Sequence, residues 1–373
     1  MFSFLDKIND NFSAFNSKKV TINVIDTGSP AVNNVIGING LPRGRVTQIW
    51  GPMGSGKSFF SMVAAKNALD ADLDSVVVWF DVENSFCYDW AEKMGIWTRD
   101  PATNRMLILK TTDGVDIFEA LYGKIKKDKF GAKKVAEGIL DNIISGSLNC
   151  PLIVIDSIAS IITPKEKASP VGSVTVSALA GFLTAELRRV SENIEKANVA
   201  LVLINQVRQS MEQYGDPFHH PGGENLRHQL SLSLYCERQQ KAETLILSTK
   251  DDKNTLIGQK VKVVVKKSRF GPAPRTAYTT FLFAEGAGYD KIGIVNAESE
   301  LIELAVEACI IKKGGAWYTL PDGEKYQGME KVQKKLEENP DLLNEIKETL
   351  NKRQNIKITG NVVEVEELMY EGE

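Results

Sequence analysis

The segment "GPMGSGKS" at residues 51–58 decides how the rest of the chain is interpreted. It has the spacing Gly-x-x-x-x-Gly-Lys-Ser, follows the apolar run "RVTQIW" and precedes the helical pattern "FFSMVAAKNAL". Glycines let the backbone curl so that several N–H groups converge on phosphate oxygens, and the helix N-terminus adds a favourable dipole. A strand before this motif and a helix after it are the context that gives the motif its meaning. The segment therefore predicts a nucleotide site in an α/β fold.

The motif also predicts which residues hold ATP and Mg²⁺. Lys57 is expected to reach the β- and γ-phosphates, and the Ser58 hydroxyl to bind the metal. Asp156 ends the apolar run "PLIVID" and is the second candidate metal ligand, acting through water. The predicted nucleotide contacts of the loop are Gly51, Pro52, Met53, Gly54, Ser55, Gly56, Lys57, Ser58 and Phe59.

A second acidic position follows another apolar run, in "VVVWFDVEN". Asp81 ends the run and Glu83 stands two residues later. A carboxylate at this place can face the γ-phosphate and polarise the attacking water, which makes Glu83 the candidate general base. The alternatives for Glu83 are a charge at a helix N-terminus or a surface salt bridge.

Short apolar runs alternate with helical patterns from about residue 44 onward. The runs "RVTQIW", "SVVVWF", "MLIL", "PLIVID" and "VALVLIN" are typical of parallel strands that are covered on both faces. This alternation predicts a doubly wound α/β core, for which we take residues 31–285. The run at 230–237 alternates strictly and is followed by further short runs, which predicts antiparallel strands at one side of the same sheet.

The two ends of the chain differ from this core. Leu5, Ile8, Phe12 and Phe15 give one apolar helical face, and 20–26 reads as a strand. Residues 1–30 are therefore predicted to be an oligomerisation arm, or else to dock on their own body. Residues 286–352 predict a small α/β domain. Residues 353–373 predict a flexible acidic tail, which either solubilises the chain or competes for a basic site.

Composition limits the class of protein. The 373 residues carry a net charge of −3, which argues against a uniformly basic nucleic-acid binder but allows a local basic stripe. Four scattered cysteines predict buried apolar positions in a reducing compartment. No signal peptide or membrane span is recognisable, and we expect a cytoplasmic protein with no membrane partner.

A basic segment follows the alternating run. Between residues 260 and 275 there are six basic residues and no acidic one. They are Lys260, Lys262, Lys266, Lys267, Arg269 and Arg275. Such a strand either meets an anionic partner or is a solvated edge.

Several motifs together resemble one family. "GLPRGRVTQIWGPMGSGKS", "FDVEN", "LIVIDSIASIITPK", "LINQVR" and "GGENLRH" occur in the order seen in the RecA-type strand-exchange recombinases, which include the phage members typified by UvsX. The resemblance runs from about residue 25 to about residue 350, through "GGAWYT", "GEKYQG" and "NPDLLNEI". It implies a RecA-like P-loop ATPase core with a mixed, mainly parallel sheet.

The resemblance also implies roles for individual residues. Residues 51–58 are the Walker A loop, Asp156 is the Walker B acid, and Glu83 activates the hydrolytic water. Trp90 lies where the family often stacks an aromatic ring on adenine; a core aromatic is the alternative. Gln206 resembles the glutamine that senses the γ-phosphate and passes the signal to DNA.

Two segments, at about 163–175 and 206–226, are the implied DNA-binding loops. Candidate DNA contacts in the second loop are Arg208, Met211, Gly222, Gly223, Asn225 and Arg227. Met211 or Val174 is a candidate wedge between bases. His219 and His220 are either DNA contacts or loop surface, and zinc binding is not expected.

The basic segment has an implied role in a filament. Lys266, together with Lys267 or Arg269, is expected to reach the γ-phosphate held by the neighbouring subunit, as an arginine finger does.

The predicted function is recombination and repair, through an ATP-dependent filament on single-stranded DNA that pairs with a homologous duplex. Single-strand-binding and mediator proteins are expected partners. The alternatives are a RecA-fold ring helicase or translocating ATPase, a mediator without turnover, and a P-loop small-molecule kinase. The sequence leaves open whether the host is a bacterium or a phage-infected cell.

Overall fold

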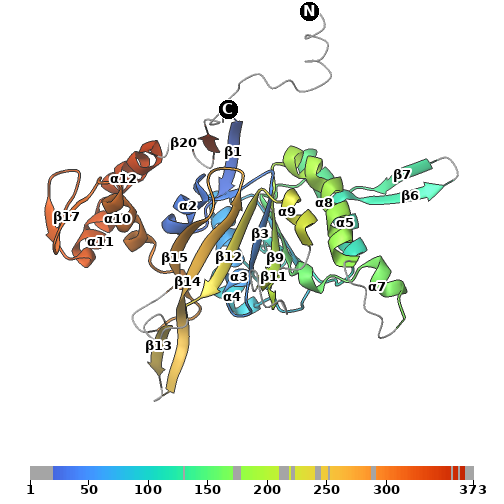
Figure 1. The fold of residues 1–373 in the computed structure, drawn as a ribbon, viewed down its shortest axis with the longest axis horizontal. Helices are drawn as coiled ribbons and strands as arrows, with labels where there is room; N and C mark the ends of the chain where they lie inside the picture. Colours follow the sequence, from blue (N-terminus) through green and yellow to red (C-terminus); the bar gives the residue numbers. More distant parts are fainter. Residues whose placement is uncertain are drawn as a thin grey trace, which may run out of the picture.

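The computed structural model describes residues 20–128, 131–170, 178–209, 218–219, 223–239, 245–250, 253–286, 291–353, 356–359 and 362–365. A ten-stranded mixed sheet lies at the centre of these residues (Figure 1). Its order is β16-β15-β14-β12-β3-β9-β8-β4-β5, and β13 pairs with β14. The strands are β3 (Val46–Gly51), β4 (Val77–Asp81), β5 (Met106–Leu109), β8 (Leu152–Asp156), β9 (Ala200–Gln206), β12 (Leu232–Arg238), β13 (Leu245–Lys250), β14 (Lys253–Ser268), β15 (Arg275–Leu282) and β16 (Gly293–Ile294).

The apolar runs of the sequence form the parallel part of this sheet. Strands β12, β3, β9, β8, β4 and β5 are parallel to one another. Strands β13, β14, β15 and β16 pair antiparallel. The prediction of a mixed, mainly parallel sheet is confirmed.

Strand β12 corrects one expectation. The run at 230–237 was predicted to be purely antiparallel, but β12 is parallel to β3 and antiparallel to β14. Its alternation has a different cause. Leu232 and Leu234 face the main core, whereas Ser233 accepts a hydrogen bond of 2.9 Å from the Trp50 indole on the other face.

Helices cover both faces of the sheet because adjacent strand residues point to opposite sides. In β4, Trp79 packs into the core under α2, α3 and α4, and Phe80 packs into the core under α5, α6, α8 and α9. The bounds of these helices are α2 (Pro30–Ile36), α3 (Lys57–Ala71), α4 (Tyr88–Lys93), α5 (Gly114–Tyr122), α6 (Ile139–Ile144), α8 (Ala178–Ala197) and α9 (Gly223–Gln229). The doubly wound core is confirmed.

A small C-terminal unit has its own apolar core. It comprises α10 (Ala297–Glu307), β17 (Lys312–Gly314), β18 (Trp317–Thr319), β19 (Lys325–Gln327), α11 (Met329–Glu338) and α12 (Pro340–Arg353). Leu301, Ile346 and Leu336 are among its buried residues. Glu300 joins it to the core, because its carboxylate accepts from the Ser29 hydroxyl at 2.5 Å and from the Ala31 N–H at 3.2 Å.

The acidic C-terminal segment differs from the expected flexible tail. Strands β20 (Ile356–Thr359) and β21 (Val362–Val365) join β1 (Val20–Ile25) and β2 (Leu41–Pro42) in the order β2-β1-β21-β20. The register places Val365 opposite Val20 and Val363 opposite Ile22. Alternating apolar residues of β21 therefore pair with the edge of β1. The many glutamates of the segment hide this strand pattern in the sequence. The helix predicted within residues 1–19 and the residues after 365 lie outside the described part.

Among the described helices, none has the length and apolar character needed to cross a membrane. Cys150 and Cys236 are buried, as predicted, whereas Cys309 is exposed at a left-handed φ of 54°.

Candidate nucleotide-binding site

The phosphate loop lies between the end of β3 and the start of α3, as the motif predicts. Gly54 and Gly56 have φ values of 73° and 85°, in the left-handed region that favours glycine. A Cβ on Gly56 would lie 2.6 Å from the Phe281 ring, and one on Gly51 would lie 2.0 Å from the Cys236 carbonyl oxygen. Close packing therefore requires glycine at these positions, and the loop leads into the N-terminus of a 15-residue helix, where backbone N–H groups and the helix dipole favour an anion.

Lys57 is buried at the first turn of α3 with its ammonium group at the loop. Its Nζ donates to the Pro52 carbonyl oxygen at 2.8 Å. Burial lowers the pKa of Lys57, and the charges of nearby Asp156 and Glu83 partly oppose this shift. A phosphate at the loop would supply an anion for this buried cation.

Asp156 ends β8 beside this lysine. It is 3% exposed, and burial raises its pKa to about 6 although the Ser58 hydroxyl donates a hydrogen bond to it. The charges of Glu83 and Asp81 raise the pKa further. Asp81 lies opposite Asp156 in the register of β4 and β8, and its Oδ2 atom is buried without a partner among the described residues.

The paired Ser58 and Asp156 fit a magnesium site. Hydroxyl and carboxylate oxygens are hard ligands, and Mg²⁺ in nucleotide sites takes few protein ligands besides water and phosphate oxygens. A cation here would also offset the three neighbouring carboxylates. No cluster of three or more His, Cys, Asp or Glu side chains suited to a metal ion exists in the described part of the chain.

Glu83 and Gln206 are joined directly. The Gln206 amide Nε2 donates to Glu83 Oε1 at 2.6 Å. The same oxygen accepts from the Ser160 hydroxyl at 3.3 Å and from the Ser157 hydroxyl. Gln206 lies opposite Gly51 in the register of β9 and β3, so the phosphate loop and this amide lie together at the carboxyl ends of the two strands.

A cavity of ≈ 290 Å³ opens at these strand ends, and most of the residues predicted to bind the nucleotide line it. Its lining comprises Met53, Gly54, Gly56, Lys57, Ser58, Phe59, Glu83, Trp90, Asp156, Ser157, Ile204, Gln206, Gln259 and Phe283. The Trp90 ring stacks on Phe283 with centroids 5.4 Å apart and contacts Phe59 edge-on. The Phe59 ring is itself buried against Trp90, Phe281 and Phe283.

Four lining residues, Ser157, Ile204, Gln259 and Phe283, were not predicted from the sequence, and the last two lie far from the loop along the chain. Gln259 donates from Nε2 to the Gly54 carbonyl oxygen at 3.1 Å and so supports the phosphate loop. Phe283 follows β15 and forms the apolar wall with Trp90. Both lie more than 200 residues after the loop, and no local motif marks them.

The basic residues Lys266 and Arg269 lie away from this cavity. Ser268 pairs with Leu232, which pairs with Thr47 near the start of β3, whereas the phosphate loop follows the end of β3. The Lys266 ammonium lies 5.5 Å from the Tyr235 ring centroid. Both basic residues are exposed, and Arg269 donates to the His228 carbonyl oxygen at 3.0 Å. Neither residue lines the cavity of its own chain: Lys266 lies at the bulge beside Ser233 and Leu234, which pair with the middle of β3, and Arg269 follows the end of β14.

The second predicted DNA loop begins directly after Gln206. Strands β10 (Arg208–Gln209) and β11 (Phe218–His219) pair antiparallel, with Arg208 opposite His219. The predicted loop extended to residue 226, but α9 already begins at Gly223, and Leu226 anchors this helix in the core. Asn225 and Arg227 are exposed on α9, and the Arg227 carbonyl accepts from Lys267. Met211, His220 and Gly222 lie outside the described residues.

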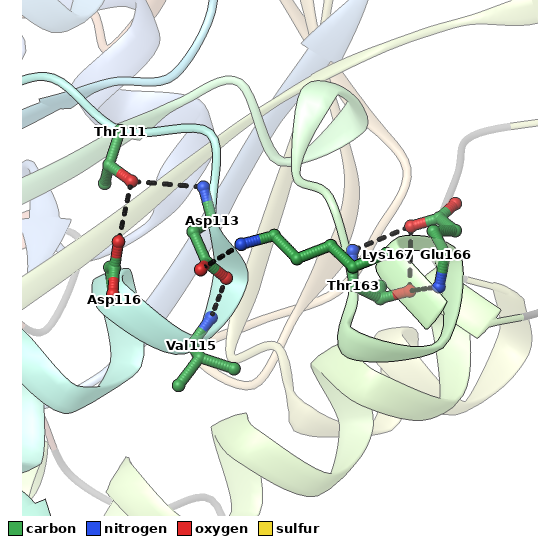
Figure 2. Close-up of polar contacts among 7 residues, drawn as sticks. All are labelled: Thr111, Asp113, Val115, Asp116, Thr163, Glu166 and Lys167. Carbon is green, nitrogen blue, oxygen red and sulfur yellow. Dashed lines mark hydrogen bonds and ion pairs between the residues drawn. The ribbon is translucent and has the colours of Figure 1, made fainter. Parts of the chain in front are cut away.

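The first predicted DNA loop begins with α7 (Pro164–Ala168), which is tied to the start of α5 (Figure 2). Thr163 and Glu166 form a capping box, with Glu166 Oε2 accepting from the Thr163 N–H at 2.7 Å. Lys167 forms an ion pair with Asp113, the residue that caps α5 through the Val115 N–H at 3.0 Å. Residues 171–177, with the candidate wedge Val174, lie outside the described part.

Comparison with known proteins gives the family. The family model for the RecA N-terminal domain matches residues 9–288, and that for the RecA C-terminal domain matches residues 299–355. Protein RecA of Streptomyces ambofaciens is 28% identical over 337 residues, 90% of this chain and 79% of that protein. Protein RecA of Lactiplantibacillus plantarum is 26% identical over 367 residues, 95% of this chain and 84% of that protein. The chain therefore belongs to the RecA family, whose members are DNA-dependent ATPases of homologous recombination and repair.

Proposed function

We propose that the cavity beside the phosphate loop is the ATP site that drives recombination by this chain. Residues 51–58 hold the phosphates through backbone N–H groups, and Lys57 neutralises their charge. Ser58 and Asp156 hold Mg²⁺, which when bound screens the negative charge between the phosphates. Trp90 and Phe283 supply the apolar wall against which a base packs.

Glu83 is the proposed base, and Gln206 is the proposed sensor. The two side chains are hydrogen-bonded to each other, which occupies both. When the cavity holds ATP, the Gln206 amide turns to the γ-phosphate, and Glu83 is released to orient the attacking water.

The single observation that carries this proposal is the 2.6 Å hydrogen bond from Gln206 to Glu83. This bond joins Glu83, the proposed base, to Gln206, the last residue of β9, and β10 and β11 follow within the second DNA segment. Loss of the γ-phosphate would therefore change the contacts of Gln206, and that change would pass directly to the DNA segment that follows it. Such order–disorder coupling is a common response to a γ-phosphate.

The site is completed by a second subunit in this proposal. Lys266, with Lys267 or Arg269, lies outside the cavity of its own chain and reaches the phosphate loop of a neighbouring copy in a head-to-tail filament in this proposal. The matches to both RecA domains do not favour a ring helicase or translocating ATPase.

Further parts of the proposal follow from the family. Residues 163–175 and 206–222, together with the start of α9, bind single-stranded DNA, with contacts from Arg208, Met211, Gly222, Gly223, Asn225 and Arg227. Residues 1–30 contribute to assembly, the core spans 31–285, and the unit at 286–352 is appended to it. Single-strand-binding and mediator proteins are the proposed partners, in bacterial cytoplasm or a phage-infected cell.

The test is the effect of nucleotide on DNA affinity in Gln206→Ala. The unsubstituted protein is expected to bind fluorescein-labelled oligo-dT more tightly with ATPγS, by about 5- to 150-fold, the usual range of coupling between two sites. In Gln206→Ala the two affinities should be equal, while binding of a fluorescent ATP analogue stays within about threefold. Gln327→Ala, an exposed position in β19, is the matched control. Retained tightening in Gln206→Ala would reject the sensor role.

A further inference from the structure

The hairpin of β6 (Lys124–Asp128) and β7 (Gly131–Ala136) is a second basic feature, separate from the site described above. Six of the 13 residues from 124 to 136 are lysines, and one is acidic. In Figure 1 the hairpin extends from the end of α5 away from the central sheet. Nothing in the ATP site or the two predicted DNA loops uses it.

The root of the hairpin is narrow and firmly held. A Cβ on Gly138 would lie 2.3 Å from the Gly123 nitrogen, so the chain leaves and re-enters the body at one point. Lys124 pairs with Glu119 at 3.6 Å, and Lys134 pairs with Asp141. The two lysines nearest the body are therefore neutralised by acids of α5 and α6, and they orient the hairpin.

The outer part of the hairpin concentrates positive charge. The register places Lys126 directly opposite Lys133, and like charges at opposite positions destabilise a ribbon. Ile125 and Val135 are 50% and 48% exposed, so apolar burial does not offset that cost. Folding of the hairpin alone gives no reason for this arrangement, whereas binding of an anionic partner does.

We propose that the β6–β7 hairpin binds the phosphate backbone of duplex DNA, with Lys126, Lys127 and Lys133 as the contacting residues. Lys126 and Lys133 are paired in the register of the hairpin, and Lys127 is the next residue along β6. A two-stranded ribbon fits the major groove of B-DNA, where phosphates lie on both sides. Contacts from lysine to phosphates make no demand on base sequence.

The position of the hairpin indicates what role a bound duplex would have. Helix α5 has nine residues, so about 14 Å separates its start at Asp113, which holds α7, from its end at the hairpin root. The hairpin would thus hold an incoming duplex near the single-strand segments. This role rests on the proposed function, because it requires residues 163–175 to bind the single strand.

The test is the triple variant Lys126→Gln, Lys127→Gln, Lys133→Gln, which keeps the root lysines. The matched control is Lys312→Gln, Lys313→Gln, Lys325→Gln, three exposed positions in β17 and β19. Affinity for a fluorescein-labelled 30-bp duplex is measured with ATPγS between 50 and 200 mM KCl. Single-strand affinity and poly-dT-stimulated ATP hydrolysis are measured on the same samples.

We expect the triple variant to bind the duplex at least about tenfold more weakly. The slope of log K against log salt should be smaller by about 0.9 for each lysine–phosphate pair that the substitutions remove, or roughly 2.7 in all. Single-strand affinity and hydrolysis should stay within about twofold of the unsubstituted protein, and the control should match it throughout.

Three results would overturn the proposal. One is an unchanged duplex affinity and salt slope, which would assign the hairpin to a protein partner or to solvent. Another is an equal loss of single-strand affinity. In the third, the triple substitution no longer weakens duplex binding once residues 366–373 are removed. That result would make the acidic C-terminus, and not DNA, the partner of the hairpin. Failure of the proposed function is separate, since it appears as absent DNA-stimulated hydrolysis in the unsubstituted protein.

Discussion

Burial governs the chemistry of Lys57 and Asp156. Both side chains are less than 10% exposed, and the pKa of each is shifted towards the neutral form, down for the lysine and up for the acid. Desolvation is the main cause in both cases, because a buried charge loses its hydration. Phosphates would supply a counter-charge for Lys57, and a divalent cation would supply one for Asp156, so both charged forms would be stabilised when these ligands are bound.

Lys57→Ala should abolish ATP turnover with little effect on folding. The substitution removes the cation that balances the β- and γ-phosphates, a role that no other described residue of the cavity lining shares. The measurement is single-strand-stimulated phosphate release, with Tm as the folding control. Normal hydrolysis in this variant would remove Lys57 from the site assignment.

Asp156→Asn should stabilise the ligand-free protein at neutral pH while abolishing turnover. The pKa of Asp156 is about 6 in the folded state against an ordinary 3.8, so the folded state binds more protons between those values. This contribution to stability is present at low pH and is lost as pH rises from about 4 to about 6. Asparagine avoids the cost of the buried charge, at most about 3 kcal/mol.

Thermal unfolding in EDTA across pH checks this. The Tm of Asp156→Asn should exceed that of the unsubstituted protein at pH 7.5, and the difference should shrink as pH approaches 4. A lower Tm for the variant at pH 7.5 would show that the Ser58 hydrogen bond and neighbouring charges already satisfy the carboxylate.

At the scale of elements, the ends of parallel strands bring the active groups together. The register aligns Gly51 with Gln206 and Asp81 with Asp156, so the carboxyl ends of four strands lie side by side. Ligands of open α/β sheets bind at the carboxyl ends of the strands, because the loops that leave them carry polar groups. The two proposed DNA-binding segments also follow the carboxyl ends of parallel strands, since α7 follows β8 and β10 follows β9.

The Lys167–Asp113 ion pair at the base of α7 should position the first DNA segment rather than stabilise the fold (Figure 2). The lysine is 49% exposed, and exposed pairs contribute about 0.2–1 kcal/mol. Lys167→Ala should therefore change Tm little but speed amide exchange at residues 163–170 and weaken single-strand binding.

Two further variants control this prediction. Asp113→Asn keeps the cap on α5, because asparagine is also a good N-cap, and should reproduce the effects of Lys167→Ala. Lys165→Ala, exposed on the same helix, should change neither exchange nor binding. Equal effects of Lys165→Ala and Lys167→Ala would assign them to net charge instead of the ion pair.

At the scale of the whole molecule, two separate surfaces carry complementary halves of one proposed site. The phosphate loop lies on one surface, and Lys266, which is exposed and does not line the cavity of its own chain, lies on the other, so the proposal joins them by a head-to-tail contact between copies. Such a contact does not close on itself and extends into a filament when the rotation is helical.

Mixing two inactive variants tests this arrangement. Lys57→Ala and Lys266→Ala should each hydrolyse ATP poorly alone. An equimolar mixture should regain about a quarter of normal activity, because random head-to-tail assembly joins an intact Lys57 to an intact Lys266 in that share of interfaces. Hydrolysis is measured on poly-dT with the total protein held constant. A mixture no more active than its components would place Lys266 outside the shared site.

Some features were predictable because contiguous residues encode them. The phosphate loop, the strands before Asp81 and Asp156 and the helix after Lys57 follow from glycine spacing and apolar periodicity. The tail is the contrary case. Its five glutamates after residue 361 predicted a flexible segment, yet β21 pairs with β1, because a strand edge near the other end of the chain selects the alternating valines.

Neighbouring residues along the chain encode the phosphate loop, the strand–helix alternation and the carboxylates that end buried strands. Contacts between residues far apart in the sequence arise only in the folded sheet. Strand order and register placed Gln206 against Glu83, Gln259 against the loop, and Lys266 outside the cavity of its own chain. The physical reason is that such contacts depend on which distant strands pair, and pairing minimises the free energy of the whole sheet rather than of any segment.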